Sequence, residues 1–129
     1  MRKTKLFLAV LVFTVVACQR AESQAVAKIS NQALADEIKN GKAPLILDVR
    51  TPEEFQAGHI PGAVNIPHDQ LASRLSELPI SKSDEVVVHC EKGGRAAKAE
   101  AVLEGAGYTK VEDLQGHMHE WRDSGLPMQ

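Results

Sequence analysis

The chain alternates short apolar runs with helical stretches, and this alternation limits the folds that it can adopt. The segment 45–49 is a short, mainly apolar run, and 84–89 is the clearest strand candidate because it is rich in β-branched valine. Short continuous apolar runs are typical of strands that are buried on both faces of a sheet. Shorter strand candidates lie at 27–30, 63–66 and 111–114. Because helical stretches separate these strands, we predict an α/β fold with a parallel sheet covered by helices on both faces.

Local signals mark where the helices begin and end. The best defined one begins with Thr51 as its cap and Pro52 at its first position, and it ends at Gly58. Asn31 is predicted to cap a helix over 32–39. Three further helices are expected over 69–78, 95–104 and 117–123. The side chains of Phe55 and Trp121 are expected in the core.

Composition excludes several classes of protein. The 129 residues suffice for one domain, and the formal net charge is −2. No basic block is long enough to follow a nucleic-acid backbone, so nucleic-acid binding has little support. Two cysteines cannot form the disulfide framework of a small secreted protein. There is no CxxC motif and no zinc-like spacing of Cys and His, so no metal site is predicted.

Residues 1–17 have the pattern of a secretory signal peptide. Arg2, Lys3 and Lys5 precede the apolar run 6–17, in which only Thr14 is polar. Twelve helical residues span about 18 Å, which is too short for the ~30 Å core of a bilayer. The alternative is a buried N-terminal helix, but a helix that is apolar all round needs a larger core than this chain can supply.

The end of this segment, Val15-Val16-Ala17-Cys18, resembles the lipobox of bacterial lipoproteins. The resemblance implies cleavage before Cys18, lipid attachment to Cys18, a tether over 18–26 and a mature domain over 27–129. Gln19 favours the outer membrane over the inner one, on the periplasmic side. Removal of residues 1–17 takes away three positive charges and lowers the formal net charge from −2 to −5. The alternative is a plain signal peptide that ends near a cysteine.

The segment that bears chemistry follows the predicted strand 84–89. Cys90 leaves the carboxyl end of this strand and is followed by Glu91, Lys92, Gly93, Gly94 and Arg95, after which a helix begins. Ligands bind at this edge of parallel α/β sheets. Two glycines allow several backbone N–H groups to point inwards, and the helix N-terminus, Lys92 and Arg95 add positive charge. Such a loop favours the thiolate form of Cys90. The alternative is a buried structural cysteine, which would leave the glycine pair unexplained.

The motif 90–95 resembles the Cys-x-x-Gly-x-Arg active loop of single-domain rhodanese-like sulfurtransferases. Segments 48–67 and 114–127 resemble the first and last signatures of the same family. The resemblance implies a five-stranded parallel sheet flanked by helices. It also implies that Cys90 accepts a sulfane sulfur from a small-molecule donor and passes it, as a persulfide, to cyanide, a thiol or an acceptor protein. No metal or organic cofactor is implied.

Two alternatives to this activity remain. Related dual-specificity phosphatases have a longer loop, whereas only four residues, Glu91 to Gly94, separate Cys90 from Arg95 here. The smaller loop suits one sulfur atom rather than a phosphate. The second alternative is a rhodanese module without turnover that carries a persulfide or binds a partner protein.

Several residues near the motif have open roles. Glu91 places a negative charge beside the nucleophile, which disfavours highly charged donors such as thiosulfate. Four charged residues are supporting candidates that could pair with one another or with Arg95 and so orient the loop: Asp48, Arg50, Glu53 and Glu54. His117 stands where the family often has a second glycine. Two readings of it stay open: it lines the mouth of the pocket, or it is an exposed turn histidine. His89 is expected to point away from Cys90 because strand side chains alternate.

Overall fold

The computed structural model describes residues 25–129, and the predicted signal peptide and Cys18 lie outside this range. The signal peptide, the lipid anchor and the periplasmic location therefore stay predictions. Among residues 25–129, no helix is both long enough and apolar enough to cross a bilayer.

The described chain forms a five-stranded parallel sheet with helices on both faces, as predicted. The strands are β1 (Ala27–Ile29), β2 (Leu45–Asp48), β3 (Val64–Asn65), β4 (Glu85–His89) and β5 (Lys110–Leu114). Their order in the sheet is β1-β5-β4-β2-β3. All four pairings are parallel, and Asp48 of β2 is aligned with His89 of β4. The central position of β4 brings Cys90 to the middle of the carboxyl edge of the sheet.

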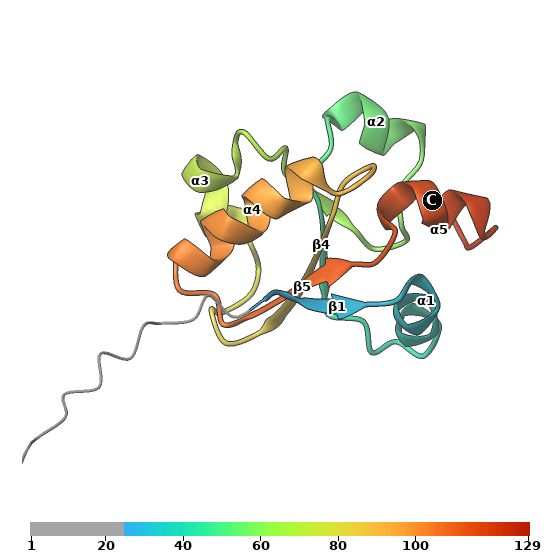
Figure 1. Ribbon diagram of the computed structural model, residues 1–129, viewed down its shortest axis with the longest axis horizontal. Coiled ribbons are helices and arrows are strands. Elements are labelled where there is room, and N and C mark those ends of the chain that lie inside the picture. Colours follow the sequence, from blue (N-terminus) through green and yellow to red (C-terminus); the bar gives the residue numbers. More distant parts are fainter. Residues whose placement is uncertain (1–24) are drawn as a thin grey trace, which may run out of the picture.

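The helices are α1 (Asn31–Lys39), α2 (Pro52–Ala57), α3 (Leu71–Arg74), α4 (Gly94–Gly105) and α5 (His117–Asp123), with a 3-10 turn over Leu75–Glu77. Figure 1 shows α3 and α4 on one side of the sheet and α1 on the other. The loop that follows β4 lies near α2 and α5 in the same view.

Alternation along the strands divides the core into two layers. Val86 and Val88 face α3 and α4, together with Leu47 and Cys90. Val87 faces α1 and α5, where it packs with Ile46. Successive side chains of a strand point to opposite faces, so the continuous apolar runs of β2 and β4 supply both layers. Trp121 is fully buried in the second layer, as predicted.

The structure corrects four details of the sequence analysis. Ser30, rather than Asn31, caps α1, and its side chain accepts a hydrogen bond from the Ala33 N–H. The helix expected over 69–78 is a short α-helix followed by the 3-10 turn, because Pro79 forces Leu78 into an extended conformation. The strand expected over 63–66 has two residues, since β3 is an edge strand and Pro67 cannot donate a hydrogen bond. Phe55 is half-buried outside both core layers and stacks on His59, with ring centroids 3.7 Å apart.

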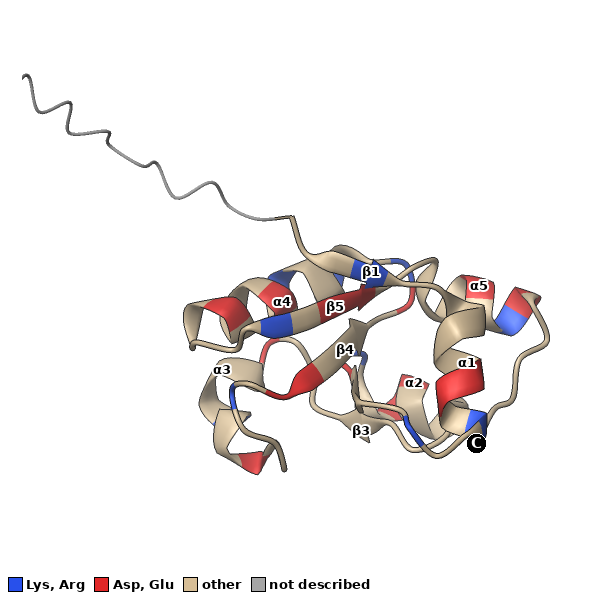
Figure 2. Cartoon of the chain, turned by 90° about the horizontal axis from the view of Figure 1, so that it is seen from below, with Lys and Arg blue, Asp and Glu red and all other residues tan. Residues whose placement is uncertain are grey.

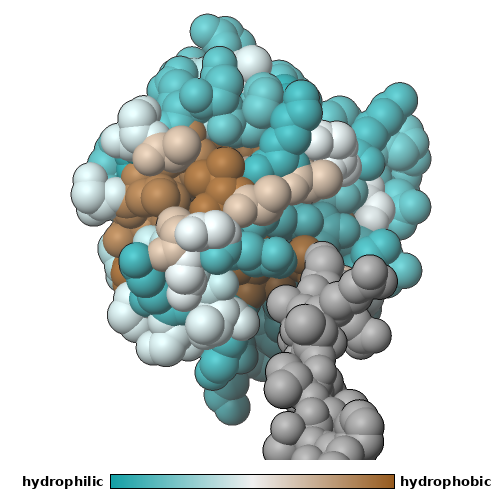
Figure 3. All heavy atoms as spheres, turned by 60° about the vertical axis from the view of Figure 1, so that its left-hand side comes forward, coloured by the Kyte–Doolittle hydropathy of each residue, from teal (hydrophilic) through white to brown (hydrophobic). Residues whose placement is uncertain are grey.

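Charged and apolar groups are distributed differently over the surface. Basic and acidic residues are interspersed over the described elements (Figure 2). Figure 3 shows apolar residues gathered on the side of the molecule that lies to the left in Figure 1. A hollow at the amino ends of β2 and β4 is lined partly by Pro44, Leu45 and Ile80. This hollow lies at the opposite end of the sheet from Cys90.

Candidate active site

The candidate active site is the loop between β4 and α4. Cys90 follows the last residue of β4, and α4 begins at Gly94. Gly93, just before the helix, has a φ of +121°, a conformation that side chains with a Cβ rarely adopt. This turn directs the Gly93 N–H towards the Cys90 Sγ, at an N–S distance of 3.0 Å. The first turn of α4 adds its partial positive charge on the same side.

The thiol is covered rather than open to solvent. Cys90 is only 1% exposed, and it is the one free cysteine among the described residues. Beside the loop, a hollow of about 210 Å³ is lined by charged residues and three small or apolar ones: Arg50, Glu54, Ala57, Gly58, Glu91, Arg122 and Met128. A molecule that enters this hollow must displace part of the cover to reach the sulfur.

Helix α5 holds the loop through its first amides. The Met118 N–H donates to the Cys90 carbonyl at 3.1 Å, and the His119 N–H donates to the Glu91 carbonyl at 3.1 Å. The first N–H groups of a helix have no partners within the helix and can bind acceptors elsewhere. The segment that was singled out as the last signature therefore fixes the backbone of the first two loop residues.

Arg95, at the end of the loop, is paired with a carboxylate of α2. The Arg95 guanidinium donates two hydrogen bonds to the Glu54 carboxylate, at 2.6 and 3.1 Å. These bonds lower the pKa of Glu54 to about 2. Glu54 also completes a capping box with Thr51 at the start of α2. Arg95 therefore ties α4 to α2, and its pairing with Glu54 is one of the pairings that the sequence predicted.

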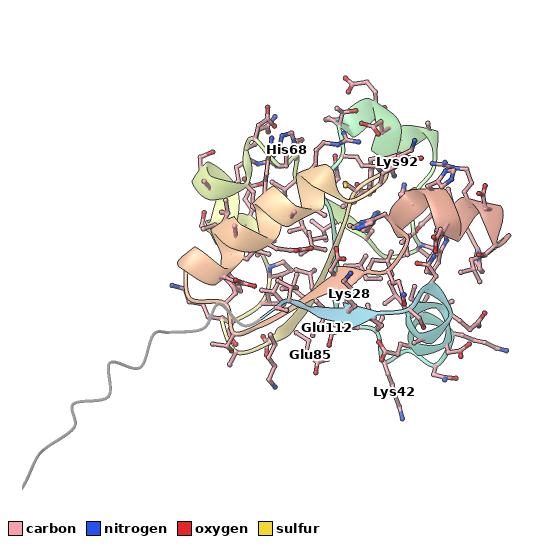
Figure 4. The ribbon with its side chains drawn as sticks, in the orientation of Figure 1. Lys28, Lys42, His68, Glu85, Lys92 and Glu112 are labelled. Carbon is pink, nitrogen blue, oxygen red and sulfur yellow. The ribbon has the colours of Figure 1, made fainter. Side chains whose placement is uncertain are left out.

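Glu91 is bound by an arginine that the sequence analysis did not single out. Arg122 of α5 donates to both oxygens of Glu91, at 2.8 and 3.1 Å, and Arg50 Nη1 lies 3.7 Å from the same carboxylate. The hydrogen bonds from Arg122 are the largest cause of a lowered pKa at Glu91. Lys92, by contrast, is exposed, and Figure 4 places it at the turn between β4 and α4.

Asp48 and Arg50 form a buried ion pair next to the loop. Asp48 is fully buried and accepts hydrogen bonds from the Arg50 backbone and guanidinium, the shortest of them 2.7 Å long. Arg50 Nη2 also donates to the Gly58 carbonyl at 2.9 Å. The pair therefore anchors the end of α2 to the carboxyl edge of the sheet, and Asp48 does not contact the sulfur.

The two histidines next to the loop have different surroundings. His89 is fully buried, its Nε2 lies 3.7 Å from Asp48, and burial lowers its pKa to about 4. His117 is 6% exposed, and its Nδ1 accepts a hydrogen bond from the Cys90 N–H at 3.3 Å. The interpretation of His117 as an exposed turn residue is therefore wrong, because the loop and the sheet cover its ring. Sequence spacing could not reveal a contact between residues 27 positions apart.

Among residues 25–129, no cluster of three or more His, Cys, Asp or Glu side chains could hold a metal ion. The protein belongs to the general class of parallel α/β domains in which a loop at the carboxyl edge of the sheet presents a cysteine.

The family follows from a match of residues 30–124 to the rhodanese-like domain. This chain belongs to the rhodanese-like domain family. It is 35% identical over 101 residues to a sulfurtransferase of Allochromatium vinosum, covering 78% of this chain and 92% of that protein. It is 43% identical over 91 residues to thiosulfate sulfurtransferase 16, chloroplastic, of Arabidopsis thaliana, covering 63% and 76% of the two chains.

A crystal structure of a rhodanese-related protein from Thermoplasma volcanium has the same fold. The TM-score is 0.69 at 29% sequence identity, and the match covers 80% of this chain and 97% of that one. Together with the sequence relatives, this likeness supports membership of a family that includes sulfurtransferases.

Proposed function

We propose that this protein is a sulfurtransferase that carries sulfane sulfur as a persulfide on Cys90. The observation that carries the proposal is the Gly93 N–H, which points at the Cys90 Sγ from 3.0 Å. A backbone donor in this place stabilises negative charge on sulfur before and after transfer. Relatives named as sulfurtransferases support the same chemistry.

The reaction consists of two displacements on sulfur. With thiosulfate as the donor, the Cys90 thiolate attacks the outer sulfur, a new S–S bond forms, and sulfite leaves with the electron pair of the broken S–S bond. An acceptor such as cyanide or a thiolate then attacks the terminal sulfur, and the Cys90 thiolate leaves. Both steps conserve electrons, so the cycle needs no added oxidant or reductant.

Peptide mass spectrometry tests the proposal. Full-length protein incubated with thiosulfate is expected to gain about 32 Da, the mass of one sulfur, on the thiol. Trypsin would place this gain on the peptide 83–92, which contains Cys90, and would separate it from Cys18. Added cyanide should remove the gain and release thiocyanate. Protein alkylated beforehand is the control, and absence of the adduct with every sulfane donor tested would refute the proposal.

A persulfide carrier without turnover is the second candidate, and the burial of the thiol favours it. Cys90 is only 1% exposed, which limits direct access of an acceptor from solution. The same experiment separates the two functions. A carrier would form the adduct but would transfer it neither to cyanide nor to small thiols.

We further propose that the Glu91–Arg122 pair restricts the use of highly charged donors. Glu91 occupies the guanidinium of Arg122 and adjoins that of Arg50, so neither is free to bind the sulfonate end of thiosulfate. The variant Glu91→Gln is expected to lower the KM for thiosulfate about three- to tenfold, because it releases charge-assisted donors. Steady-state kinetics would measure this, with the exposed Glu53→Gln as the control. An unchanged or higher KM in Glu91→Gln contradicts the idea.

The cellular location belongs to this proposal as well. We place the sulfurtransferase domain on the periplasmic side of a membrane, held there by a lipid on Cys18. The proposal rests on the sequence pattern of residues 1–18 alone.

A further inference from the structure

We propose that His117 is a positioning residue for Cys90: its unprotonated Nδ1 accepts a hydrogen bond from the Cys90 N–H, and its protonated Nε2 faces the Asp113 carboxylate. The inference rests on the proposed function only in those tests that measure sulfur transfer; the NMR test does not depend on it. The family resemblance provided no role for this histidine, which stands where relatives often have glycine.

Hydrogen-bond chemistry fixes the protonation state of the ring. The Cys90 N–H can only donate, so the Nδ1 that lies 3.3 Å from it must carry a free electron pair. The neutral ring then bears its proton on Nε2, which lies 3.3 Å from Asp113 Oδ1. The carboxylate on one side and the amide on the other therefore select a single tautomer.

The shape of the loop depends on the same ring. A Cβ on Gly93 would lie 2.9 Å from His117 Nε2, so the ring packs directly against the residue that donates to the sulfur. His117 has a φ of +51° and is the only non-glycine residue of the described chain with a positive φ. Such a conformation is unusual for a side chain with a Cβ and marks sites where the surroundings dictate it. Here it places the ring beneath both Cys90 and Gly93.

A second carboxyl group adjoins Asp113. Glu100 of α4 is buried, and its Oε1 has no hydrogen-bond partner among the described residues. Burial, and then the neighbouring Asp113, raise the pKa of Glu100 to about 8. Glu100 is therefore protonated near neutral pH, and this state avoids two negative charges side by side. With Glu100 neutral, the Asp113 carboxylate can face the Nε2–H of His117 without a second negative charge beside it.

The titratable groups that act on the His117 ring lie on four elements. Lys28 of β1, labelled in Figure 4, disfavours a positive ring, as burial does, whereas Asp113 of β5 and Glu120 of α5 favour it. His89 of β4 is close enough for the two rings to influence each other. Burial is the largest of these effects, so the pKa of His117 is lowered from its usual 6.5 and the ring is neutral at neutral pH.

This arrangement predicts a loss of sulfur transfer in acid. Protonation of Nδ1 would set two N–H groups against each other and remove the acceptor of the Cys90 N–H. A buried N–H that loses its partner destabilises the conformation that needed it. Persulfide formation should therefore fall as the pH drops through the pKa of His117, below about 6.5.

Three variants of the full-length chain test the role. In His117→Gly the backbone keeps its conformation easily but the acceptor is lost, and persulfide formation is expected to slow by roughly tenfold or more at pH 7. In His117→Asn the side-chain oxygen can accept from Cys90 and cannot titrate, so most of the rate should return at pH 7 and the rate should no longer follow the titration of the ring. His119→Asn is the matched control, because His119 is exposed and pairs with Asp123.

Nitrogen NMR of the imidazole rings provides a readout that is independent of activity. The expected spectrum shows His117 with its proton on Nε2, and the Cys90 amide resonance shifts together with the titration of that ring. A proton on Nδ1 would overturn the inference, as would a pH profile that is the same in wild type and in His117→Asn. If the wild-type protein forms no persulfide at all, the proposed function fails, while the NMR result still decides the role of His117.

Discussion

The variant Gly93→Ala is expected to slow persulfide formation at Cys90 by about 100-fold or more. Two observations support this size of effect. A φ of +121° strains any residue with a Cβ, and the added carbon would lie 2.9 Å from the His117 ring. The loop must shift to relieve the backbone strain or the clash with His117, and this shift turns the Gly93 N–H away from the sulfur. Removal of one preorganised donor from a site of developing negative charge typically costs about 10²–10³ in rate.

The neighbouring Gly94→Ala variant is the matched comparison. Gly94 has no positive φ, and an added Cβ would meet no atom within 4 Å. We expect its rate to stay within about threefold of wild type, because the first position of a helix accepts alanine without strain. Single-turnover mass spectrometry would measure both variants, with circular dichroism to confirm folding. Equal losses in the two variants would show that general loop disturbance, rather than the Gly93 donor, controls the reaction.

Features set by local sequence were the most predictable parts of this molecule. The capping box of α2 depends on Thr51 and Glu54, three positions apart, and the sequence analysis placed the helix start correctly. The apolar run of β2 likewise predicted a strand buried on both faces, and most of β2 is buried. Local signals also misled: Asn31 was taken as the cap of α1 in place of Ser30, and over 69–78 one stripe of leucines outweighed the effect of Pro79.

Contacts between distant segments could not be derived in the same way. Glu91 is bound by Arg122, which lies 31 positions away, and Cys90 by His117, which lies 27 positions away. Both contacts exist because β5 lies next to β4 in the sheet and therefore brings α5 to the loop. The sequence shows which residues are charged, but it does not show that β5 lies next to β4. The sequence therefore predicted a negative charge beside the nucleophile without its partner Arg122, and it left the position of His117 open.

The variant Asp48→Ala is expected to lower the free energy of unfolding by about 3–5 kcal/mol, because it leaves a buried arginine without its main partner. Arg50 is 2% exposed and Asp48 is fully buried, so water cannot replace the lost carboxylate without opening the fold. The remaining carboxylate is that of Glu91, 3.7 Å from Arg50 Nη1 and already bound by Arg122. Total stabilities of small domains are about 5–15 kcal/mol, so much of the margin would be lost. Urea unfolding followed by circular dichroism would measure it.

A double variant distinguishes the buried charge from the lost contact. In Asp48→Ala with Arg50→Met, no uncompensated charge remains, and the apolar side chain fills part of the space. We expect this protein to recover most of the stability, since hydrophobic replacement of a buried ion pair is often nearly neutral. Glu77→Ala, which breaks the exposed Arg74–Glu77 pair, should leave the unfolding midpoint unchanged. If the double variant were as unstable as Asp48→Ala alone, the ion pair would matter for the geometry it imposes at Gly58 rather than for charge compensation.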